Sequence, residues 1–546
     1  MADFTPPTQD QLLAMEVCAG IADLARHDRF SAATPDVVGA IAEGYAAHVE
    51  QGWNTIAAPA EFGGQGLPFT LATNVIENLG AANMAFTLLP ILTVGAIEAL
   101  HHHGSADQKA LYLPRLISGE WSGTMNLTEP QAGSDVGALR TTATPVTEGP
   151  HTGKYRIAGQ KIFITWGEHE LAGNIIHLVL ARVPGAPEGS RGISLFIVPK
   201  YLVGPDGAPS APGARNDLAC VGLEHKLGVN ASPTCVMSFG EHGECIGELV
   251  GRENEGLRAM FTMMNSARVN VGNQGVHIAE RALQQALAYA RERVQSPRAG
   301  SPDKAPVAII EHPDVRRMLL RMRALTEGAR ALLYYNTGQI DRGTLGDEAA
   351  ARRAELLVPL TKAWCTDAAM EVTSLNIQIH GGMGFIEETG AAQHFRDARI
   401  PPIYEGTNGI QAADLVTRKL GMEGGGVLFA LMDEIERDAD GGAALAALAR
   451  TCARIGRWMA NDATLDDKLA GSVPFCTMCA VAVAGWQLLR QTRAVASGMA
   501  PGLEATKPVV TRYFLEHIVP QAAGLEASAI GGAGLFYLLD AGQLAG

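Results

Sequence analysis

The spacing of hydrophobic residues divides this chain into four stretches of different texture. From residue 9 to about 120, apolar residues recur at the three- and four-residue spacing of helices that bury one face. From about 121 to 251 the pattern changes to short alternating runs separated by Gly and Pro, which predicts an antiparallel β-domain. Helical periodicity returns from about 255 to 420, and it continues in Ala- and Leu-rich sequence after 427.

These runs define the expected elements and their order. Strands are predicted at residues 155–158, 161–164, 175–180 and 193–198, and long helices at 257–294, 312–341 and 348–375. The glycine-rich run 421–426 predicts a linker. We therefore expect an α+β protein with a helical domain at 1–120, a β-domain at 121–251, a second helical domain at 252–420 and an additional helical domain at 427–546. A β-domain between helical domains offers a crevice for a cofactor.

Composition narrows the class of protein. The 546 residues include 57 acidic and 43 basic side chains, which gives a net charge of −14, and 47% of the residues are hydrophobic. This content supports a large folded core and argues against a disordered chain. Nucleic-acid binding is not expected, because it needs an excess of cations facing phosphate. A large enzyme is the expectation that fits best.

Signals for the location of the protein point to the cytoplasm. The sequence starts without a basic, apolar or Arg/Ser-rich targeting segment. Its most apolar long window, 84–100, is interrupted by Pro90, Gly95 and Glu98, so we expect no membrane span. Eight scattered cysteines fit a reducing compartment.

Two features that could bind metal are expected to be structural. Cys476 and Cys479 have CxxC spacing, but the sequence around them has no second pair or His partner, which predicts buried thiols. The triplet His101-His102-His103 ends a helix before a glycine, and no metal is expected there.

Two short segments carry candidate chemistry. In 126–135, small and hydroxyl-bearing residues around Gly133 would let backbone N–H groups approach a polar ring or a phosphate. An ordinary loop that feeds the first strand is the alternative. In 403–411, Glu405 lies among apolar and aromatic residues, where desolvation would raise its pKa and strengthen it as a base. A solvated turn glutamate is the alternative there.

Taken together and in order, these segments resemble the acyl-CoA dehydrogenase family over residues 9 to 420. Residues 127–135 resemble its first signature, and residues 378–385, 396–399 and 403–407 resemble its second. Further family motifs recur between them at 112–114, 119–120 and 159–161. Several ordered motifs are far more specific than a single glycine motif.

The resemblance implies a fold and a reaction. It implies N-terminal helices, a middle antiparallel β-barrel domain and a C-terminal four-helix bundle, with FAD at their junction and the additional helical domain appended. Glu405 would remove the α-proton of an acyl-CoA thioester while hydride leaves the β-carbon for flavin N5, giving the 2,3-enoyl-CoA. The backbone N–H of Glu405 would bind the thioester oxygen, and Arg268 would lie near base and substrate.

The resemblance also assigns residues by position. Substrate contacts are expected at Ser134, Arg268, Tyr404 and Gly406. The FAD contacts are expected at Leu127, Thr128, Gly133, Ser134, Phe163, Thr165, Arg293, Gln378, Gly381, Gly382 and Thr407. Of these, Arg293 would reach the pyrophosphate of a neighbouring subunit's FAD.

The chain departs from the family pattern at three of its motifs. Asn126 stands where a small residue or Cys is usual, and Phe163 stands where Trp is most frequent, so stacking is retained but an indole N–H is lost. His312 is followed by Pro313 where the family often has Gln, which removes one expected FAD contact. Lys226 could bind a CoA phosphate, although a structural role in its turn is the favoured interpretation.

The additional module makes the chain resemble a long bacterial branch of the family. This branch includes 3-(methylthio)propanoyl-CoA and fatty acyl-CoA dehydrogenases, and the sequence does not decide between these substrates. The resemblance implies an electron-transferring flavoprotein as electron acceptor and a homodimer rather than a tetramer. A DNA-binding flavoprotein of the alkylation-response type is the alternative. It is disfavoured because residues 427–546 have 9 Lys and Arg against 12 Asp and Glu, a net charge of −3. A folded, non-catalytic relative is disfavoured by the intact Glu405.

Overall fold

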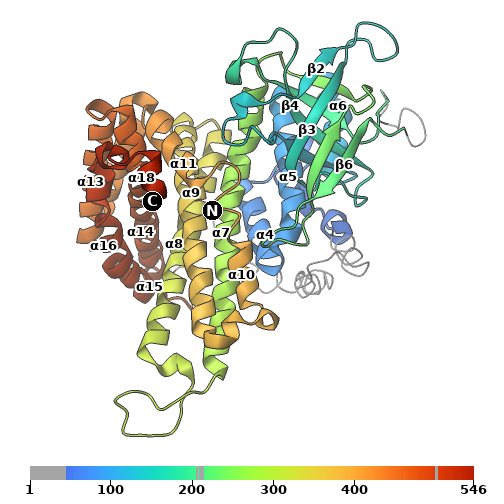
Figure 1. The fold of residues 1–546 in the computed structure, drawn as a ribbon. Coiled ribbons are helices and arrows are strands. Elements are labelled where there is room, and N and C mark those ends of the chain that lie inside the picture. Colours follow the sequence, from blue (N-terminus) through green and yellow to red (C-terminus); the bar gives the residue numbers. More distant parts are fainter. Residues whose placement is uncertain (1–44, 205–206, 208–213, 499–501) are drawn as a thin grey trace. The chain divides into compact units, whose positions relative to one another are not determined.

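Contacts along the chain divide the protein into two compact units, Met1–Ala267 and Arg268–Gly546. The structure is a computed structural model that describes residues 45–204, 207, 214–498 and 502–546 (Figure 1). The first part of the helical stretch predicted from residue 9 lies outside these described residues. The four-domain division expected from the sequence stays a prediction.

In the described part of unit 1, a helical segment at residues 45–50 and three complete α-helices precede the sheet. The complete helices are α4 (Phe69–Ala82), α5 (Met84–His103) and α6 (Ala106–Ser118). Asn83 caps α5 by accepting a hydrogen bond from the Phe86 N–H, and Ser105 forms a capping box with Gln108 at the start of α6. These caps explain why the chain can turn sharply between consecutive helices.

Eight strands of unit 1 form one sheet. Its order is β1-β4-β5-β8-β3-β7-β6, with β2 paired to β3. The strands are β1 (Trp121–Asn126), β2 (Thr142–Pro145), β3 (Tyr155–Thr165), β4 (Asn174–Ala181), β5 (Ser194–Pro199), β6 (Leu218–Leu223), β7 (Thr234–Phe239) and β8 (Ile246–Val250).

Two details of the sheet differ from the sequence prediction. The pairing of β1 with β4 is parallel, with Trp121 opposite Asn174, whereas the other paired strands are antiparallel. The chain makes β2 and β3 before it returns to β4, and a connection of that length permits a parallel pair. The strands predicted at 155–158 and 161–164 are one strand, β3, with an irregularity between Lys161 and Ile164.

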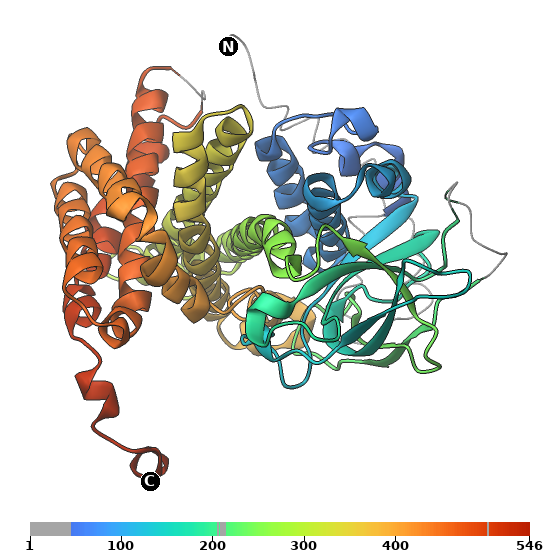
Figure 2. The ribbon, with the colours of Figure 1, turned by 90° about the horizontal axis from the view of Figure 1, so that it is seen from above.

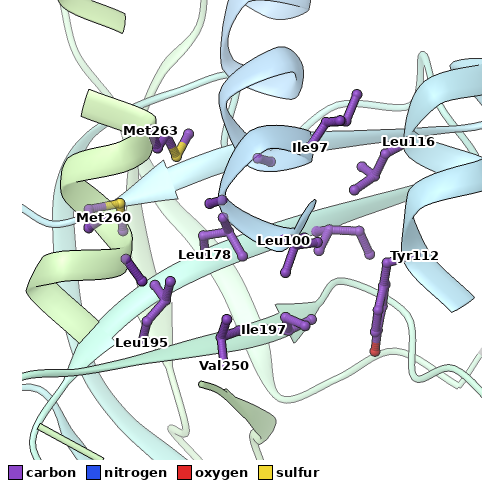
Figure 3. Close-up of a cluster of buried hydrophobic side chains, with 14 of the residues drawn as sticks. Ile97, Leu100, Tyr112, Leu116, Leu178, Leu195, Ile197, Val250, Met260 and Met263 are labelled. Carbon is purple, nitrogen blue, oxygen red and sulfur yellow. The ribbon is translucent and has the colours of Figure 1, made fainter. Parts of the chain in front are cut away.

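The helices and the sheet of unit 1 share a hydrophobic core. Figure 3 shows side chains of α5 and α6 meeting those of β4, β5 and β8, together with two methionines from the start of α7 (Gly256–Glu292). The labelled core residues are Ile97, Leu100, Tyr112, Leu116, Leu178, Leu195, Ile197, Val250, Met260 and Met263. Burial of this apolar surface joins the N-terminal helices and the sheet into one unit.

Unit 2 contains long helices and the appended module. Its long helices are α7, which begins in unit 1, α8 (Pro313–Thr344) and α9 (Glu348–His380). α9 extends five residues beyond its predicted end at 375, because the polar residues there have tertiary partners. The Asn376 amide, for example, donates to Gln285 Oε1 on α7 at 2.8 Å. Two shorter helices follow, α10 (Ala391–Asp397) and α11 (Asn408–Asp414).

The predicted linker is a tight turn. Glu423, Gly424 and Gly425 all have left-handed backbone conformations, with φ of 52°, 65° and 93°, which glycine adopts at little cost. The helices of the module then follow, as Figure 2 shows in orange and red. They are α12 (Gly426–Asp438), α13 (Ala443–Asn461), α14 (Leu465–Ala496), α15 (Lys507–Tyr513), α16 (Val519–Ala523), α17 (Glu526–Ile530) and α18 (Ala541–Ala545).

The appended module packs on the long helices. α14 contacts α8 and α9. Two ion pairs also join the module to the long helices: Lys507 of α15 pairs with Glu327 of α8, and Glu434 of α12 pairs with Arg353 of α9. Cys476 and Cys479 lie buried on α14 as free thiols, as predicted. The module therefore belongs to the same compact unit as the bundle.

Among the described residues, two helices are long and apolar enough to cross a membrane by length and composition. They are α5 and α14, and 78% and 72% of their most apolar windows are buried inside the protein. Because both helices pack in the cores of their units, burial within the protein explains their apolar composition.

Glycine sets the distance between α7 and α9. A Cβ on Gly275 would lie 2.4 Å from the Cys365 carbonyl oxygen, and a Cβ on Gly272 would lie 2.8 Å from the Thr361 methyl group. The two helix backbones can approach this closely because neither glycine carries a side chain.

We expect Gly275→Ala to lower the free energy of unfolding by about 1–3 kcal/mol, because the added methyl group meets backbone. The matched control is Gly338→Ala on α8, where an added Cβ would have no heavy atom within 4 Å. The control should raise stability by up to about 1 kcal/mol, since Ala is the better helix former. Urea denaturation of both variants measures the difference, and equal effects would contradict the role assigned to Gly275.

Candidate active site

Glu405 lies in an unusual turn of unit 2. It has a φ of 55°, and the next residue, Gly406, has a φ of 78°, so two successive residues adopt the left-handed conformation. A side chain with a Cβ is strained in this region, and such strain gathers at functional sites. The turn ends at Thr407, whose hydroxyl caps α11 by accepting from the Ile410 N–H at 3.2 Å.

Side chains from two helices hold this turn by its carbonyl groups. The Gln411 amide donates to the Glu405 carbonyl oxygen at 3.0 Å and to that of Gly406 at 3.3 Å. Arg268 Nε on α7 donates to the same Glu405 oxygen at 3.4 Å. Because the backbone is fixed from both sides, the direction of the Glu405 side chain is constrained.

The surroundings of Glu405 suit a base. Burial raises its pKa to about 7, against the opposing effects of the cations Arg268 and Lys362. A carboxylate that titrates near neutral pH is a stronger base than an ordinary glutamate, yet it is still ionised in a useful fraction. Buried Arg268 also faces Asp414, with Nη1 4.0 Å from Oδ2.

Lys362 is a buried cation that the sequence interpretation missed. It lies on α9 with no exposed surface, and its Nζ donates to Asn408 Oδ1 at 2.9 Å. Burial lowers its pKa to about 7, although Glu405 and Asp367 oppose that change. The available signal was a single charged residue inside the apolar run 356–364. Lysines are rarely buried without an electrostatic reason.

Asn408 and Gln274 complete the polar surroundings. The Asn408 amide group donates to the Asp367 carboxylate at 2.7 Å and to the Ala363 carbonyl at 3.1 Å, so it links α11 to α9. The Tyr404 hydroxyl donates to Gln274 Oε1 on α7. The hydroxyl of Tyr404, a predicted substrate contact, is therefore engaged within the protein.

The predicted cofactor residues of unit 2 fall into two groups. Thr407 lies in the Glu405 turn, whereas Gln378, Gly381 and Gly382 lie at the C-terminal end of α9, about 24 Å along that helix from Lys362. Tyr289, near the end of α7, stacks on His380 with ring centroids 4.2 Å apart. This places the ends of α7 and α9, and with them Arg293, beside each other.

The residues of this second group are open to a ligand. Gln378, Gly381 and Gly382 are exposed, and a Cβ on either glycine would have no heavy atom within 4 Å. Exposed Arg293 donates to Gln295 Oε1 at 2.9 Å. His312 precedes Pro313 at the first turn of α8, and its ring nitrogen lies 2.7 Å from the Gln295 carbonyl oxygen.

The six predicted cofactor residues of unit 1 lie on two segments that are bonded to each other. Leu127, Thr128, Gly133 and Ser134 follow β1, and Phe163 and Thr165 lie on β3. The segments are joined because the Ile162 N–H donates to the Thr128 carbonyl at 2.9 Å, and the Thr124 hydroxyl donates to the Thr165 carbonyl at 2.8 Å.

A buried ion pair fixes the loop after β1. Lys161 Nζ lies 2.8 Å from Glu129 Oε1, with side chains 0% and 4% exposed, and it also donates to the Leu127 carbonyl at 2.9 Å. The Glu129 carboxylate further accepts from Thr141 and from the Arg140 N–H. Burial alone would raise the pKa of Glu129, but Lys161 and these donors hold it at about 2. This pairing was not predicted, although both residues belong to motifs that resemble the family.

Phe163 offers a free aromatic face. It lies at the irregularity of β3 with a φ of 60°, and its side chain is 59% exposed. The strained, exposed phenylalanine on β3, together with open space at Gly133 and hydroxyls at Thr128 and Ser134 on the segment after β1, fits a planar, polar ring system with attached phosphates. The residues present thus fit FAD.

The other candidates have structural partners. Lys226 Nζ donates to the Ser232 carbonyl at 2.8 Å and closes its own loop. His103 Nε2 lies 2.8 Å from the Thr262 hydroxyl. Within the described ranges, no group of three or more His, Cys, Asp or Glu is arranged to hold a metal ion.

Family models match the chain in four consecutive segments. The acyl-CoA dehydrogenase N-terminal, middle and C-terminal domains match residues 15–120, 124–241 and 254–420. A fourth model, acetyl-CoA dehydrogenase C-terminal like, matches residues 436–539.

Comparison with individual proteins gives relatives of the same family. The chain is 53% identical to 3-methylmercaptopropionyl-CoA dehydrogenase of Ruegeria pomeroyi, over 84% of this chain and 80% of that protein. It is 34% identical to the broad-specificity linear acyl-CoA dehydrogenase FadE5 of Mycobacterium tuberculosis, over 87% of this chain and 82% of that protein. The fold resembles an acyl-CoA dehydrogenase from Bacillus anthracis solved with FAD, with a TM-score of 0.77, 21% identity, and coverage of 100% of this chain and 90% of that one.

We expect Lys362→Met to move the pH profile of acyl-CoA oxidation to higher pH by about 1 unit or more. Lys362 lowers the pKa of Glu405, so its loss leaves the base protonated up to a higher pH and slows turnover below that pH. Lys419→Met is the control, since this buried lysine is paired with Glu355 at 3.0 Å. Rates measured from pH 5.5 to 9 test the prediction, and parallel shifts in both variants would contradict it.

Proposed function

This chain belongs to the acyl-CoA dehydrogenase family, whose members catalyse FAD-dependent oxidation of acyl-CoA thioesters, and we propose that its preferred substrate is 3-(methylthio)propanoyl-CoA. The product would be the corresponding 2,3-enoyl-CoA. The support for this substrate is the 53% identity, over most of both chains, to a relative named for it. That likeness is well above the 34% shared with the linear acyl-CoA dehydrogenase.

The observation that carries the proposed chemistry is the setting of Glu405. Its pKa of about 7 and its fixed, left-handed backbone make it a positioned base. We assign it the removal of the α-proton, which becomes acidic enough when the thioester carbonyl is polarised. Its own backbone N–H is the protein donor we propose for that carbonyl oxygen. Arg268 acts on the base by holding its carbonyl group and by favouring the ionised carboxylate.

The cofactor assignments follow from the fit described above. FAD, when bound, supplies the acceptor for the hydride that leaves the β-carbon. We propose that Leu127, Thr128, Gly133 and Ser134 bind its polar edge and that Phe163 and Thr165 cover its ring. Gln378, Gly381, Gly382 and Arg293 lie at a separate end of unit 2, which supports the expectation that they contact the FAD of a neighbouring subunit. We further propose Thr407 as a cofactor contact, and Ser134, Tyr404 and Gly406 as substrate contacts.

A plain linear acyl-CoA is the second candidate substrate. It is supported by the match to FadE5, which covers 87% of this chain. Both candidates need the same base and the same thioester contact, so they differ in the part of the substrate beyond the β-carbon. Comparing kcat/KM for 3-(methylthio)propanoyl-CoA with that for butanoyl- and octanoyl-CoA separates them.

The expected partners follow from the family. We propose an electron-transferring flavoprotein as electron acceptor, a homodimer as assembly state, and a cytoplasmic location. A DNA-binding role receives no support from charge, because residues 427–546 have a net charge of −3.

We expect Glu405→Gln to retain FAD and lose substrate-dependent reduction of it by about a hundredfold to ten-thousandfold, because the amide cannot accept the α-proton. The measurement is anaerobic bleaching of the yellow protein after mixing with 3-(methylthio)propanoyl-CoA in a stopped-flow instrument. Glu388→Gln, an exposed glutamate of the same unit, is the control and should react like the unaltered protein. Full-rate bleaching by the Glu405 variant would disprove the assigned base.

We expect Phe163→Ala to weaken FAD binding about tenfold, because the variant loses a large aromatic stacking surface. Phe163→Trp should bind FAD at least as tightly as the unaltered protein. Both are measured by titrating apoprotein with FAD and following flavin fluorescence. The control is Val221→Ala, which shortens another exposed apolar side chain of the sheet. Unchanged affinity in Phe163→Ala would remove Phe163 from the cofactor site.

A further inference from the structure

The end of unit 2 forms an apolar arm. Residues 534–546, here called the C-terminal arm, comprise a short 3₁₀ turn and α18, and they project from the helices of their unit (Figure 2). Six large apolar side chains of the arm are 51–73% exposed, and these are Leu535, Phe536, Tyr537, Leu538, Leu539 and Leu544. A contiguous apolar surface of this kind marks an interaction site in a folded protein.

The arm leaves the unit at a fixed point. The Ala533 N–H donates to Asp467 Oδ1 at 2.9 Å, and Asp467 also belongs to the capping box with Thr464 that starts α14. Gly532, just before it, has a φ of 71° and allows the chain to turn away. The root of the arm is therefore tied to the N-terminal end of α14.

The same end of α14 carries an apolar stripe. Leu465, Leu469 and Val473 follow one another at four-residue spacing, so they lie on one face of the helix. They are 60%, 39% and 48% exposed. Unit 2 thus presents an apolar arm and an apolar stripe at one corner, and the exposed side chains of each are available to a partner.

We propose that the arm of one copy of this chain packs on the α14 stripe of a second copy, and that the second copy returns the same contact. Because root and stripe lie at the same helix end, a twofold axis near that corner makes the two exchanges equivalent, as in the self-complementary interfaces of dimers.

The area involved is appropriate for an interface between copies. With roughly 150 Å² for each large side chain, the exposed part of six of them amounts to about 600 Å² per arm. Two arms and the two stripes that they cover bury more than about 1,200 Å², which is the lower end of specific interfaces.

Charge favours a protein partner over a lipid surface. After Arg512 the sequence has no Lys or Arg, and the one charged side chain of the arm is Asp540. Segments that lie on anionic membranes combine an apolar face with Lys and Arg. The arm has the apolar face without the cations, so a second apolar protein surface is the better match.

The inference deepens the proposed homodimer and is tested on the FAD-loaded full chain. Sedimentation velocity over a concentration series compares it with a chain that ends at Ala533 and with the double variant Leu469→Glu, Val473→Glu. Both changes should raise the concentration of half-association about a hundredfold or more, since each buried leucine accounts for about tenfold or more. Leu345→Glu, which alters a leucine that is 88% exposed elsewhere in unit 2, is the control and should have no effect. Far-UV circular dichroism shows that each variant is folded, independently of the FAD contacts proposed across the two copies.

A second measurement identifies the contact. A benzophenone amino acid at position 536 is activated in protein co-assembled from light and nitrogen-15-labelled copies. Light–heavy crosslinks to residues 465–477 of α14 are expected. Crosslinks confined within one copy, binding of the arm to phosphatidylserine vesicles instead, or an assembly that truncation leaves unchanged would overturn the arm exchange while leaving the homodimer intact. A full-length holoenzyme that is monomeric would overturn both.

Discussion

The close crossing of α7 and α9 is the constraint on which the catalytic surroundings depend. The backbones of the two helices are in close contact at Gly275 and Cys365. This contact sets the distance between the two helix axes, and therefore between the Cα atoms that carry the site's side chains. Arg268 comes from α7, Lys362 comes from α9, and both act on the electrostatics of Glu405. A wider crossing would move two buried cations relative to one carboxylate, and in a medium of low polarity such displacements change ionisation strongly.

The same arrangement explains why a strained turn persists at this position. A left-handed glutamate costs stability, and it is retained because Gln411, Arg268 and the cap at Thr407 determine the backbone on both sides. The packing of the helices thereby stabilises the strained turn, and the turn sets the orientation and the surroundings of one carboxylate. The cost of the turn is local, whereas the stabilisation comes from the whole helical unit.

The sequence predicted much of this arrangement, and what it missed has a physical reason. Helical and strand periodicity identified the main elements, and ordered motifs identified the family and Glu405, because these signals are local in the chain. Lys362 was not predicted as a site residue, and the contact between Glu129 and Lys161 was not predicted. Their meaning depends on burial and on partners 32 or more residues away, which periodicity does not report. The parallel β1–β4 pair was mispredicted for the same reason, since strand direction is set by the path between strands. All the site assignments, including that of Glu405 as the base, stay predictions.

The Glu129–Lys161 pair has a consequence for how the protein acquires its cofactor. The pair and its backbone donors hold the loop after β1 in place through contacts made entirely by the protein. The loop loses its conformational freedom when the chain folds, so on our proposal that this loop binds FAD, little entropy remains to be lost in binding. Cofactor uptake by the folded apoprotein is then a docking event onto a preorganised surface.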